Sequence, residues 1–352
     1  MAPMTTWASN EDYTISDEEV QHYKARVNGL GLVITGCSRV TPNGIGFTHE
    51  FASYDDSFIA SLRKLATAAK SGGAPAILQI YHAGNKALPD LVPEGDVVSA
   101  SDVAIGSSAF VENTNPPRPL TNEEISGMID AFGKTTARAI AAGFDGIELH
   151  GAHGFLLQNF FSPVFNQRTD SWGGSPENRM RFPLEVVQEI QRVIKEKADR
   201  PFLLGYRISP EEAADSYTID DVLPFIDELI ELDIDYLHVS LSDVLHAMPI
   251  GKTEGKTIIE IILDHVDDTI PVIAAGNIRQ PEDAERAIQS GLASVAIGQA
   301  LIMNPNWADL AKTGTTASES LDLSQTRELA IPEKLAIVIE SAKGWFNVME
   351  NQ

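Results

Sequence analysis

The 352-residue chain is poor in cysteine and in positive charge. Its one cysteine, Cys37, allows neither an internal disulfide nor a site in which several cysteines bind zinc or an iron–sulfur cluster. The 26 Lys and Arg residues stand against 50 Asp and Glu, which gives a net charge of −24. A surface of that sign repels nucleic acids and anionic membranes, so neither is an expected partner.

Long apolar runs are also missing. No stretch has the roughly 18 or more consecutive apolar residues that a transmembrane helix needs. The N-terminal "MAPMTTWASNEDY" has neither the cationic start nor the apolar segment of a secretory signal peptide. Together with the single cysteine, these absences predict a cytoplasmic protein without a membrane partner.

The sequence does contain an alternation of short apolar runs and longer amphipathic ones. Continuous apolar runs are typical of parallel strands that are covered on both faces. Seven such runs predict strands at residues 31–35, 74–81, 144–150, 201–209, 235–240, 270–276 and 293–298. Helical patterns between them are expected at residues 121–143, 176–196, 218–232, 256–265 and 280–290. In the first of these helices Thr121 is the expected N-cap, Glu124 completes a capping box, and Gly143 ends the helix.

The N-terminal "MAPM" supplies an eighth strand, of which only the last residues are present. Eight β/α units predict an α/β fold of the TIM (β/α)8 barrel type, with its first strand truncated at the N-terminus. An open doubly wound sheet is the rival, but it would need a glycine-rich turn from strand to helix, and "GLGLVITG" leads into a strand instead. We expect one domain over residues 1–352, with an excursion over the barrel mouth at 83–119 and a C-terminal helix and aromatic tail at 332–349.

Polar side chains follow the predicted strands at their carboxyl ends, where barrels of this type carry their sites. Gln79 and His150 end two neighbouring strands, and Arg207 lies in the next one. Glycines at the ends of strands 270–276 and 293–298 leave backbone N–H groups free to meet a phosphate. A phosphate site, an arginine, an amide and histidines on one rim predict a ligand-binding site.

Each of these residues has a simpler explanation when taken alone. An isolated histidine at a strand end is more often a hydrogen-bonded structural residue than a catalyst. The spacing of His150 and His153, with Glu148 nearby, is also compatible with a zinc site. Arg207 inside a barrel is costly unless it is paired with an anion or an electron-rich acceptor, which favours a functional role.

The residues around these strand ends resemble those of the Old Yellow Enzyme family of flavin-dependent ene-reductases. The similarity extends over nearly the whole chain and is most specific in "GFDGIELHGAHGFLLQNFFSPVFNQRTDSWGGSPENRMRF" at residues 143–182. "LQIYHAGNKA" and "LLGYRISPEE" are the next most specific segments. The resemblance implies a TIM barrel that holds FMN and takes hydride from NADH or NADPH.

Carried over residue by residue, the resemblance also implies the parts of the cofactor site. The residues expected to contact FMN are Pro3, Met4 and Thr5 along the ring, Cys37 near the ring, Gln79 at the pyrimidine edge, Arg207 at N1 and O2, and Gly276, Asn277, Gly298 and Gln299 at the phosphate. Arg207 would stabilise the negative charge of the reduced flavin. No metal is expected.

His150 and His153 are the implied catalytic residues. They would donate hydrogen bonds to the carbonyl oxygen of a substrate and so polarise a conjugated alkene for hydride attack. Phe155 lines the same site and departs from the family pattern, in which a tyrosine supplies the second proton. We therefore expect the proton to come from water or from another side chain. Alternatively, the enzyme prefers substrates that do not need this acid.

Three further positions depart from the family pattern. Gln299 stands where an arginine commonly meets the phosphate, and Asn85 replaces another common arginine. The chain also begins inside the expected first strand, so we expect Met1 to be an internal methionine of a longer protein.

The expected activity is a ping-pong oxidoreductase in which NAD(P)H and then an electrophilic alkene or similar acceptor use one site. The alternatives are an impaired flavin-binding barrel and a metal-dependent barrel lyase that uses His150 and His153. The sequence does not decide between NADH and NADPH, does not name the acceptor, and leaves the oligomeric state open, a homo-oligomer included.

Overall fold

Seven parallel strands of a curled sheet lie side by side in the order in which they occur in the sequence. In the computed structural model, which describes residues 1–105, 115–213 and 215–349, these strands are β1 (Val33–Ile34), β3 (Ala76–Tyr81), β6 (Gly146–Gly151), β7 (Leu203–Ile208), β8 (Tyr236–Ser240), β9 (Val272–Ala275) and β10 (Ser294–Val295). Six fall inside the predicted runs, and β6 extends one residue beyond the predicted 144–150. A short strand β2 (Ser38–Arg39) also pairs with β3.

The first residues of the chain lie between the two edges of this sheet. The α-amino group of Met1 donates to the carbonyl of Leu32 at 2.8 Å, and the N–H of Ile34 donates to the carbonyl of Met1 at 3.2 Å. On the other side, the N–H of Ala2 donates to the carbonyl of Ile297 at 2.9 Å. Backbone hydrogen bonds therefore close the ring at the position expected for the eighth strand, and the TIM barrel prediction is confirmed.

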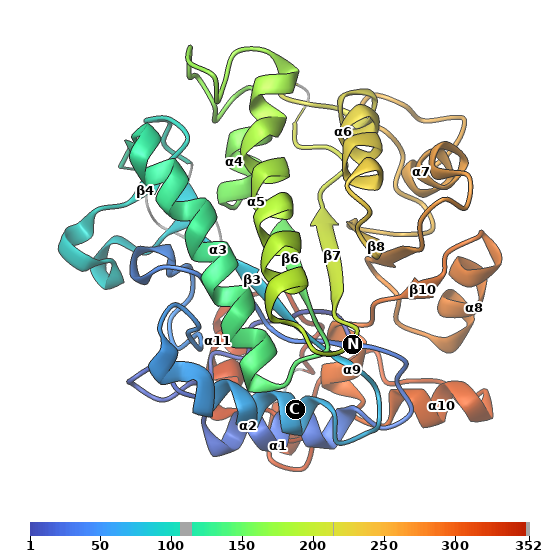
Figure 1. Cartoon of the computed structure of the whole chain (residues 1–352). Helices are drawn as coiled ribbons and strands as arrows, with labels where there is room; N and C mark the ends of the chain where they lie inside the picture. The colour runs from blue at the N-terminus through green and yellow to red at the C-terminus, as the bar shows by residue number, and fades with distance from the viewer. Residues whose placement is uncertain (106–114, 214, 350–352) are drawn as a thin grey trace.

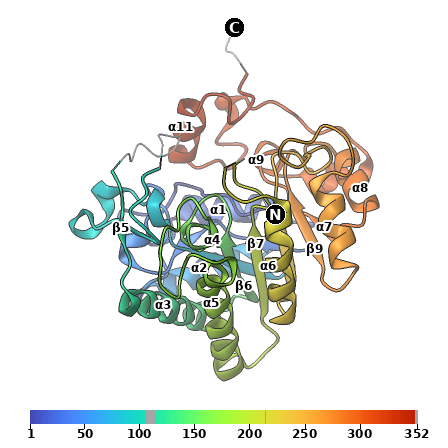
Figure 2. The same ribbon diagram turned by 90° about the horizontal axis from the view of Figure 1, so that it is seen from above.

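Helices surround the sheet on its outer side (Figures 1 and 2). The longer ones are α1 (Asp17–Arg26), α2 (Ile59–Ala69), α3 (Asn122–Ala142), α5 (Pro176–Lys197), α6 (Ile219–Glu231), α7 (Ile258–Val266) and α8 (Pro281–Gln289). Shorter helices are α4 (Leu156–Phe161), α9 (Gln299–Met303) and α10 (Trp307–Thr313), and α11 (Glu333–Ser341) has the same length as α7 and α8. No helix in these described ranges is long and apolar enough to cross a bilayer.

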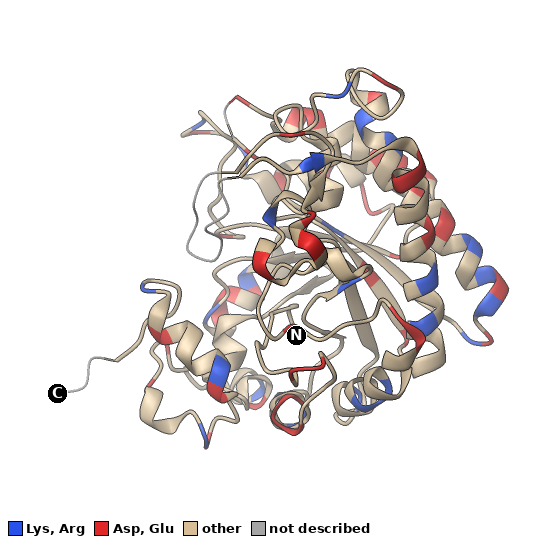
Figure 3. Ribbon diagram, turned by 90° about the vertical axis from the view of Figure 1, so that its left-hand side faces the viewer, with Lys and Arg blue, Asp and Glu red and all other residues tan. Residues whose placement is uncertain are grey.

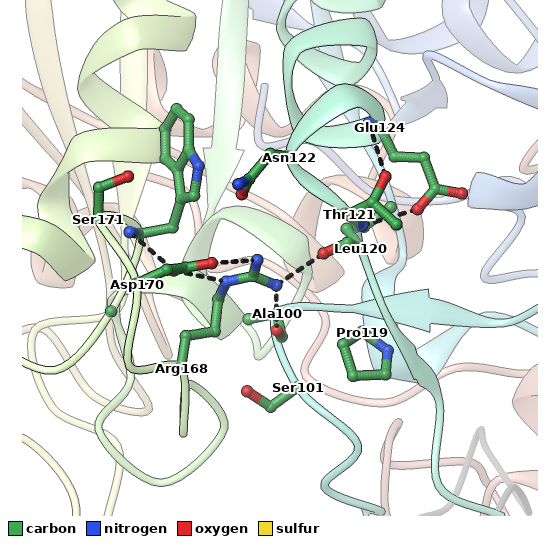
Figure 4. Close-up of polar contacts among 12 residues, drawn as sticks. Ala100, Ser101, Pro119, Leu120, Thr121, Asn122, Glu124, Arg168, Asp170 and Ser171 are labelled. Atoms are coloured by element: carbon green, nitrogen blue, oxygen red, sulfur yellow. Dashed lines mark hydrogen bonds and ion pairs between the residues drawn. The ribbon is translucent and has the colours of Figure 1, made fainter.

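The start of α3 shows how local sequence fixes a helix boundary. The backbone N–H of Glu124 donates to the Thr121 hydroxyl, and the Glu124 carboxylate accepts from the Thr121 N–H, which is the predicted capping box (Figure 4). Gly143 ends the helix in the left-handed region at φ +93°, a conformation that costs glycine little. Both predicted ends of this helix are confirmed.

Arg168, from the most specific segment of the sequence, has a structural role. Its guanidinium donates to the carbonyls of Ala100 and Leu120 at 3.0 and 2.7 Å and forms an ion pair with Asp170 (Figure 4). It therefore ties the loop after α4 to the segment that precedes α3.

In its described residues, 83–105 and 115–119, the predicted excursion contains short elements only. They are the 3-10 turns η3 (Gly84–Lys86), η4 (Pro89–Leu91) and η5 (Pro93–Gly95), and the strand pair β4 (Val98–Ser99) and β5 (Arg118–Pro119). The other 3-10 turns are η1 (Pro42–Gly44), η2 (Asp56–Phe58) and η6 (Leu323–Gln325). Residues 106–114 lie outside the described residues, so the extent of any cover over the barrel mouth stays a prediction.

Side chains alternate between the two sides of each strand and so divide the core into two regions. Leu78 and Ile80 of β3 face outward and join the large apolar cluster shared with the helices. Ile77 faces inward and joins a second apolar cluster with Tyr236 and Ile273. Above this apolar layer, the inward positions of the central strands become polar, and this change of chemistry positions the site.

Candidate active site

A cavity of about 680 Å3 opens where the strands end. All thirteen residues singled out from the sequence line it: Pro3, Met4, Thr5, Cys37, Gln79, His150, His153, Phe155, Arg207, Gly276, Asn277, Gly298 and Gln299. They come from the N-terminal stretch and from the ends of β1, β3, β6, β7, β9 and β10. The structure brings the predicted residues together, while their individual roles stay predictions.

A buried carboxylate lies in the polar layer beneath the cavity. Glu148 accepts hydrogen bonds from Gln79 Nε2 at 2.7 Å, from the Tyr236 hydroxyl at 3.0 Å and from His238 Nδ1 at 2.9 Å. Burial alone would raise the pKa of Glu148, but attraction to His238 and Arg207 and these hydrogen bonds hold it below its usual value. Burial also lowers the pKa of His238. His238 Nδ1–H thus donates to a carboxylate that the surrounding charges and hydrogen bonds keep ionised.

Arg207 projects from β7 beside this carboxylate and is 6% exposed. Its Nη2 donates to the Ser240 hydroxyl at 3.0 Å, and its Nε has no hydrogen-bond partner among the described residues. Burial lowers the pKa of Arg207, and attraction to Glu148 opposes that shift. A buried guanidinium with an unused N–H beside a cavity is suited to an electron-rich ligand atom.

The rings of His150 and His153 lie 5.0 Å apart at 75° and face the cavity from the end of β6 and the turn that follows it. The N–H of Ala152 donates to Nδ1 of His150 at 3.4 Å, so the His150 proton is on Nε2. His153 Nε2 lies 2.7 Å from the Ser240 hydroxyl oxygen. Because that oxygen accepts from Arg207, its proton is available to His153, and in that arrangement the His153 proton is on Nδ1.

Both histidines are neutral donors. Desolvation lowers the pKa of His150, which is buried, and of His153, which is exposed to the open cavity, well below that of a free imidazole, and the nearby charge of Arg207 lowers both further. His153 has φ +60°, a left-handed conformation that is uncommon for a residue with a side chain. This strain is typical of residues that a fold holds in place for function.

Phe155 packs against the histidine pair. Its ring centre lies 4.8 Å from that of His150, 4.9 Å from that of Tyr81 and 6.0 Å from that of Phe47. The nearby Tyr81 hydroxyl donates to the buried Glu50 carboxylate and accepts from the Gly46 N–H. The hydroxyl closest to the Phe155 position is thus already committed to a buried partner.

The other end of the cavity is shaped by glycine. A Cβ on Gly276, which has φ +152°, would lie 2.4 Å from the carbonyl oxygen of Leu241, and one on Gly298 would lie 2.9 Å from the sulfur of Met4. A larger residue at Gly276 would displace this backbone, so that position needs glycine, while one at Gly298 would have to move the Met4 side chain. Gln299 lines this end of the cavity, but its amide N–H donates to the carbonyl of Trp345 in the C-terminal tail.

The sequence prediction missed Arg279. This residue lines the same end of the cavity, and its Nε donates to the side-chain carbonyl of Asn277 at 2.9 Å. The available signal was an arginine three residues beyond the glycine that ends strand 270–276, in a chain with few cations. A cation is therefore present beside the glycines of the cavity, although position 299 has no charge.

The charge of the cavity is opposite to that of the protein. Lys86, Arg207 and Arg279 line it, and no Asp or Glu is among the lining residues of the described chain. The many acidic residues lie instead on the surrounding helices and loops (Figure 3). The cavity is thus built for an anionic ligand. In the described ranges, no group of three or more His, Cys, Asp or Glu residues is placed to hold a metal ion.

Residues 1–317 match the model of the NADH:flavin oxidoreductase / NADH oxidase family. The chain belongs to this family. Its members are enzymes that use a flavin with NADH or NADPH, and this chain is a nicotinamide-dependent flavin oxidoreductase.

Three relatives illustrate the range of the family. The probable NADH-dependent flavin oxidoreductase YqiG of Bacillus subtilis is 41% identical over 348 residues, which is 98% of this chain and 92% of YqiG. The NADH:fumarate oxidoreductase of Klebsiella pneumoniae is 38% identical over 339 residues, but the match covers 95% of this chain and only 36% of that protein. The solved structure of an old yellow enzyme homologue from Zymomonas mobilis has a TM-score of 0.77 at 22% identity, covering 90% of this chain and 89% of that one, which shows a shared fold.

We predict that neither cavity histidine titrates between pH 5.5 and 8. Their pKa values in the folded protein lie well below the value of about 6.5 found in an unfolded chain. Below about pH 6.5 the unfolded chain binds protons at these two histidines and the folded protein does not. The two histidines therefore lower the stability of the fold as the pH falls below about 6.5.

The measurement is NMR of histidine ring carbons in protein labelled at histidine, assigned with His150→Gln and His153→Gln variants. Shifts that stay constant across this range in the native protein, and titrate in urea, support the assignment of neutral donors. A midpoint near 6.5 for either ring in the native protein would contradict it.

Proposed function

We propose that this protein is an FMN-dependent NAD(P)H oxidoreductase that transfers hydride to an alkene conjugated with a carbonyl group. The observation that supports the proposal is the composition of the cavity, whose described lining residues include no Asp or Glu. An arginine with an unpaired N–H, a pair of neutral histidines, and two glycines with Arg279 beside them all line this one cavity. When bound, FMN would supply the centre that accepts hydride from the nicotinamide and then gives it up.

The residues of the cavity fit FMN at both of its ends. The Gly276 and Gly298 cradle and Arg279 would receive the phosphate. The guanidinium of Arg207, which lines the cavity, would meet the pyrimidine side of the ring. Because Gln79 Nε2 is held by Glu148, its Oε1 is left to accept a hydrogen bond from a ring N–H.

The histidine pair would bind the acceptor. His150 Nε2–H and His153 Nδ1–H are the protons available to a carbonyl oxygen in the cavity. Two neutral N–H donors stabilise the negative charge that develops on that oxygen when hydride reaches the β-carbon. Ser240 keeps His153 in the donating tautomer and joins it to Arg207.

The product also needs a proton at the α-carbon. Phe155 cannot provide it, and the Tyr81 hydroxyl is bonded to Glu50. In this proposal the proton comes from water. This observation favours a second class of acceptor, the quinones, whose oxygens take protons from water without a positioned acid.

The direct test is the visible spectrum of the FMN-loaded protein before and after anaerobic addition of NADH or NADPH. The proposal expects the flavin bands to bleach and then to return when 2-cyclohexenone or a benzoquinone is added. Bound flavin that neither nucleotide bleaches would instead identify an impaired flavin-binding barrel, and a protein that takes up no FMN would refute the proposal.

We predict that Arg279→Gln weakens FMN binding about 10- to 100-fold, because it removes a charge-assisted hydrogen bond to the phosphate. The dissociation constant is measured by the quenching of flavin fluorescence when apoprotein is added. Arg286→Gln is the matched control, since Arg286 is an exposed arginine of α8 outside the cavity lining. Equal affinities of Arg279→Gln and the native protein would remove Arg279 from the phosphate site.

We predict that Phe155→Tyr speeds 2-cyclohexenone reduction about 100-fold, the contribution typical of one positioned acid. Flavin reduction by NADH and the turnover of a benzoquinone should stay unchanged. Stopped-flow absorbance separates the two half-reactions. Phe47→Tyr is the control, because Phe47 lines the same cavity and contacts Phe155. An enone rate that does not rise would show that Phe155 has only a packing role.

A further inference from the structure

Lys86 lines the cavity, but the proposed FMN site gives this cation no role. It ends the 3-10 turn η3 after β3, and its side chain packs over Gly154, where a Cβ would lie 2.9 Å from Nζ. The ammonium donates to the backbone carbonyl of His153 at 2.6 Å and lies 5.8 Å from the centre of the Phe155 ring. Lys86 therefore belongs to the substrate end of the cavity.

The ammonium group has more donors than the protein satisfies. An ammonium carries three N–H donors, and the carbonyl of His153 takes one. No described carboxylate forms an ion pair with Lys86, although Glu212 attracts it from a longer distance. Burial of the side chain disfavours the charged form and lowers its pKa. An anion bound at Nζ would recover the attraction that the protein leaves unused.

The other two cations of the cavity have separate tasks. Arg279 lies at the phosphate end beside Asn277, and Arg207 lies over Glu148 at the base of the cavity. Lys86 is the third, and it is the one joined to the histidine pair. With no acidic residue among the described lining residues, a negative group beside His153 would meet the attraction of Lys86 without a carboxylate in direct contact.

We propose that Lys86 binds a carboxylate of the substrate, so that the site selects acceptors that carry both an activating carbonyl and a carboxylate. This inference rests on the proposed function and names its substrate class. Because Nζ is bonded to the residue that supplies one of the carbonyl donors, the two recognition points are close, which suits a short oxo-acid. The hydride and proton transfers described above are unchanged.

Trp7 and Phe47 add an apolar wall to the cavity, and Phe47 contacts Phe155, the ring beside Lys86. Both line it, and their ring centres lie 5.3 Å apart at 81°. Trp7 holds φ +48°, which is a strained conformation for a bulky residue. An apolar wall beside one ammonium lowers the local dielectric and strengthens the attraction between Lys86 and a carboxylate.

The test compares two dead-end ligands that differ in charge, 4-oxopentanoate and its methyl ester, by calorimetry on the FMN-loaded protein. Neither contains an alkene, so neither turns over. The native protein should bind the acid at least about 10-fold more tightly than the ester. Lys86→Gln should remove this preference and leave the affinity for the ester unchanged, while Lys86→Arg should retain most of it.

Lys70→Gln is the matched control, because Lys70 is bonded to Gly143 and Asp145 outside the cavity lining. Equal binding of acid and ester by the native protein would overturn the proposal. An equal loss of affinity for the acid and the ester in Lys86→Gln would also overturn the proposal, because it would show that Lys86 serves to hold the His153 backbone. Keto-acid binding requires no hydride transfer, so a failure of NADH to bleach the flavin would count against the proposed function and not against this site.

Discussion

The buried positive charge of Arg207 is the constraint on which the arrangement of the site depends. Withdrawing a guanidinium from water costs several kcal/mol unless an anion and hydrogen bonds offset the loss. Glu148 supplies the negative charge, and its own oxygens accept from Gln79, Tyr236 and His238. This layer holds Gln79 and Arg207 in fixed orientations at the floor of the cavity.

The same charge extends to the substrate end through Ser240. The serine hydroxyl accepts from Arg207 and lies within hydrogen-bond distance of His153, and His153 in turn accepts from Lys86 through its backbone carbonyl. A continuous set of hydrogen bonds thus runs from the barrel floor to the mouth. Because each member limits the tautomer or orientation of the next, the donors of the cavity are set before a ligand arrives.

Much of the fold and the membership of the site were predictable from the sequence. Continuous apolar runs located seven strands, and the rule that barrel sites lie at strand ends pointed to Gln79, His150, Arg207 and the glycines of the last two strands, which do line one cavity. The capping box of α3 was readable because its contacts are local, three residues apart. The family resemblance added the other predicted lining residues and the assignment of roles, and geometry alone does not test those roles.

The partners of these residues were not predictable, because they depend on the register between strands. Gln79 meets Glu148 only because β3 and β6 pair at those two residues, and Arg207 is level with His238 for the same reason in β7 and β8. Arg279 was not predicted because it lies in a loop beyond a strand end, where sequence spacing does not determine the direction of a side chain. Asn85, whose buried side-chain amide has no partner among the described residues, has no structural explanation.

The central claim is that Arg207 stabilises negative charge on a flavin in this cavity. The most direct test is the midpoint reduction potential of bound FMN in the native protein and in Arg207→Gln, measured by anaerobic titration against a reference dye, with circular dichroism to confirm that the variant is folded. The account predicts a more negative potential in the variant, because the reduced flavin loses its positive neighbour. An unchanged or more positive potential would contradict it.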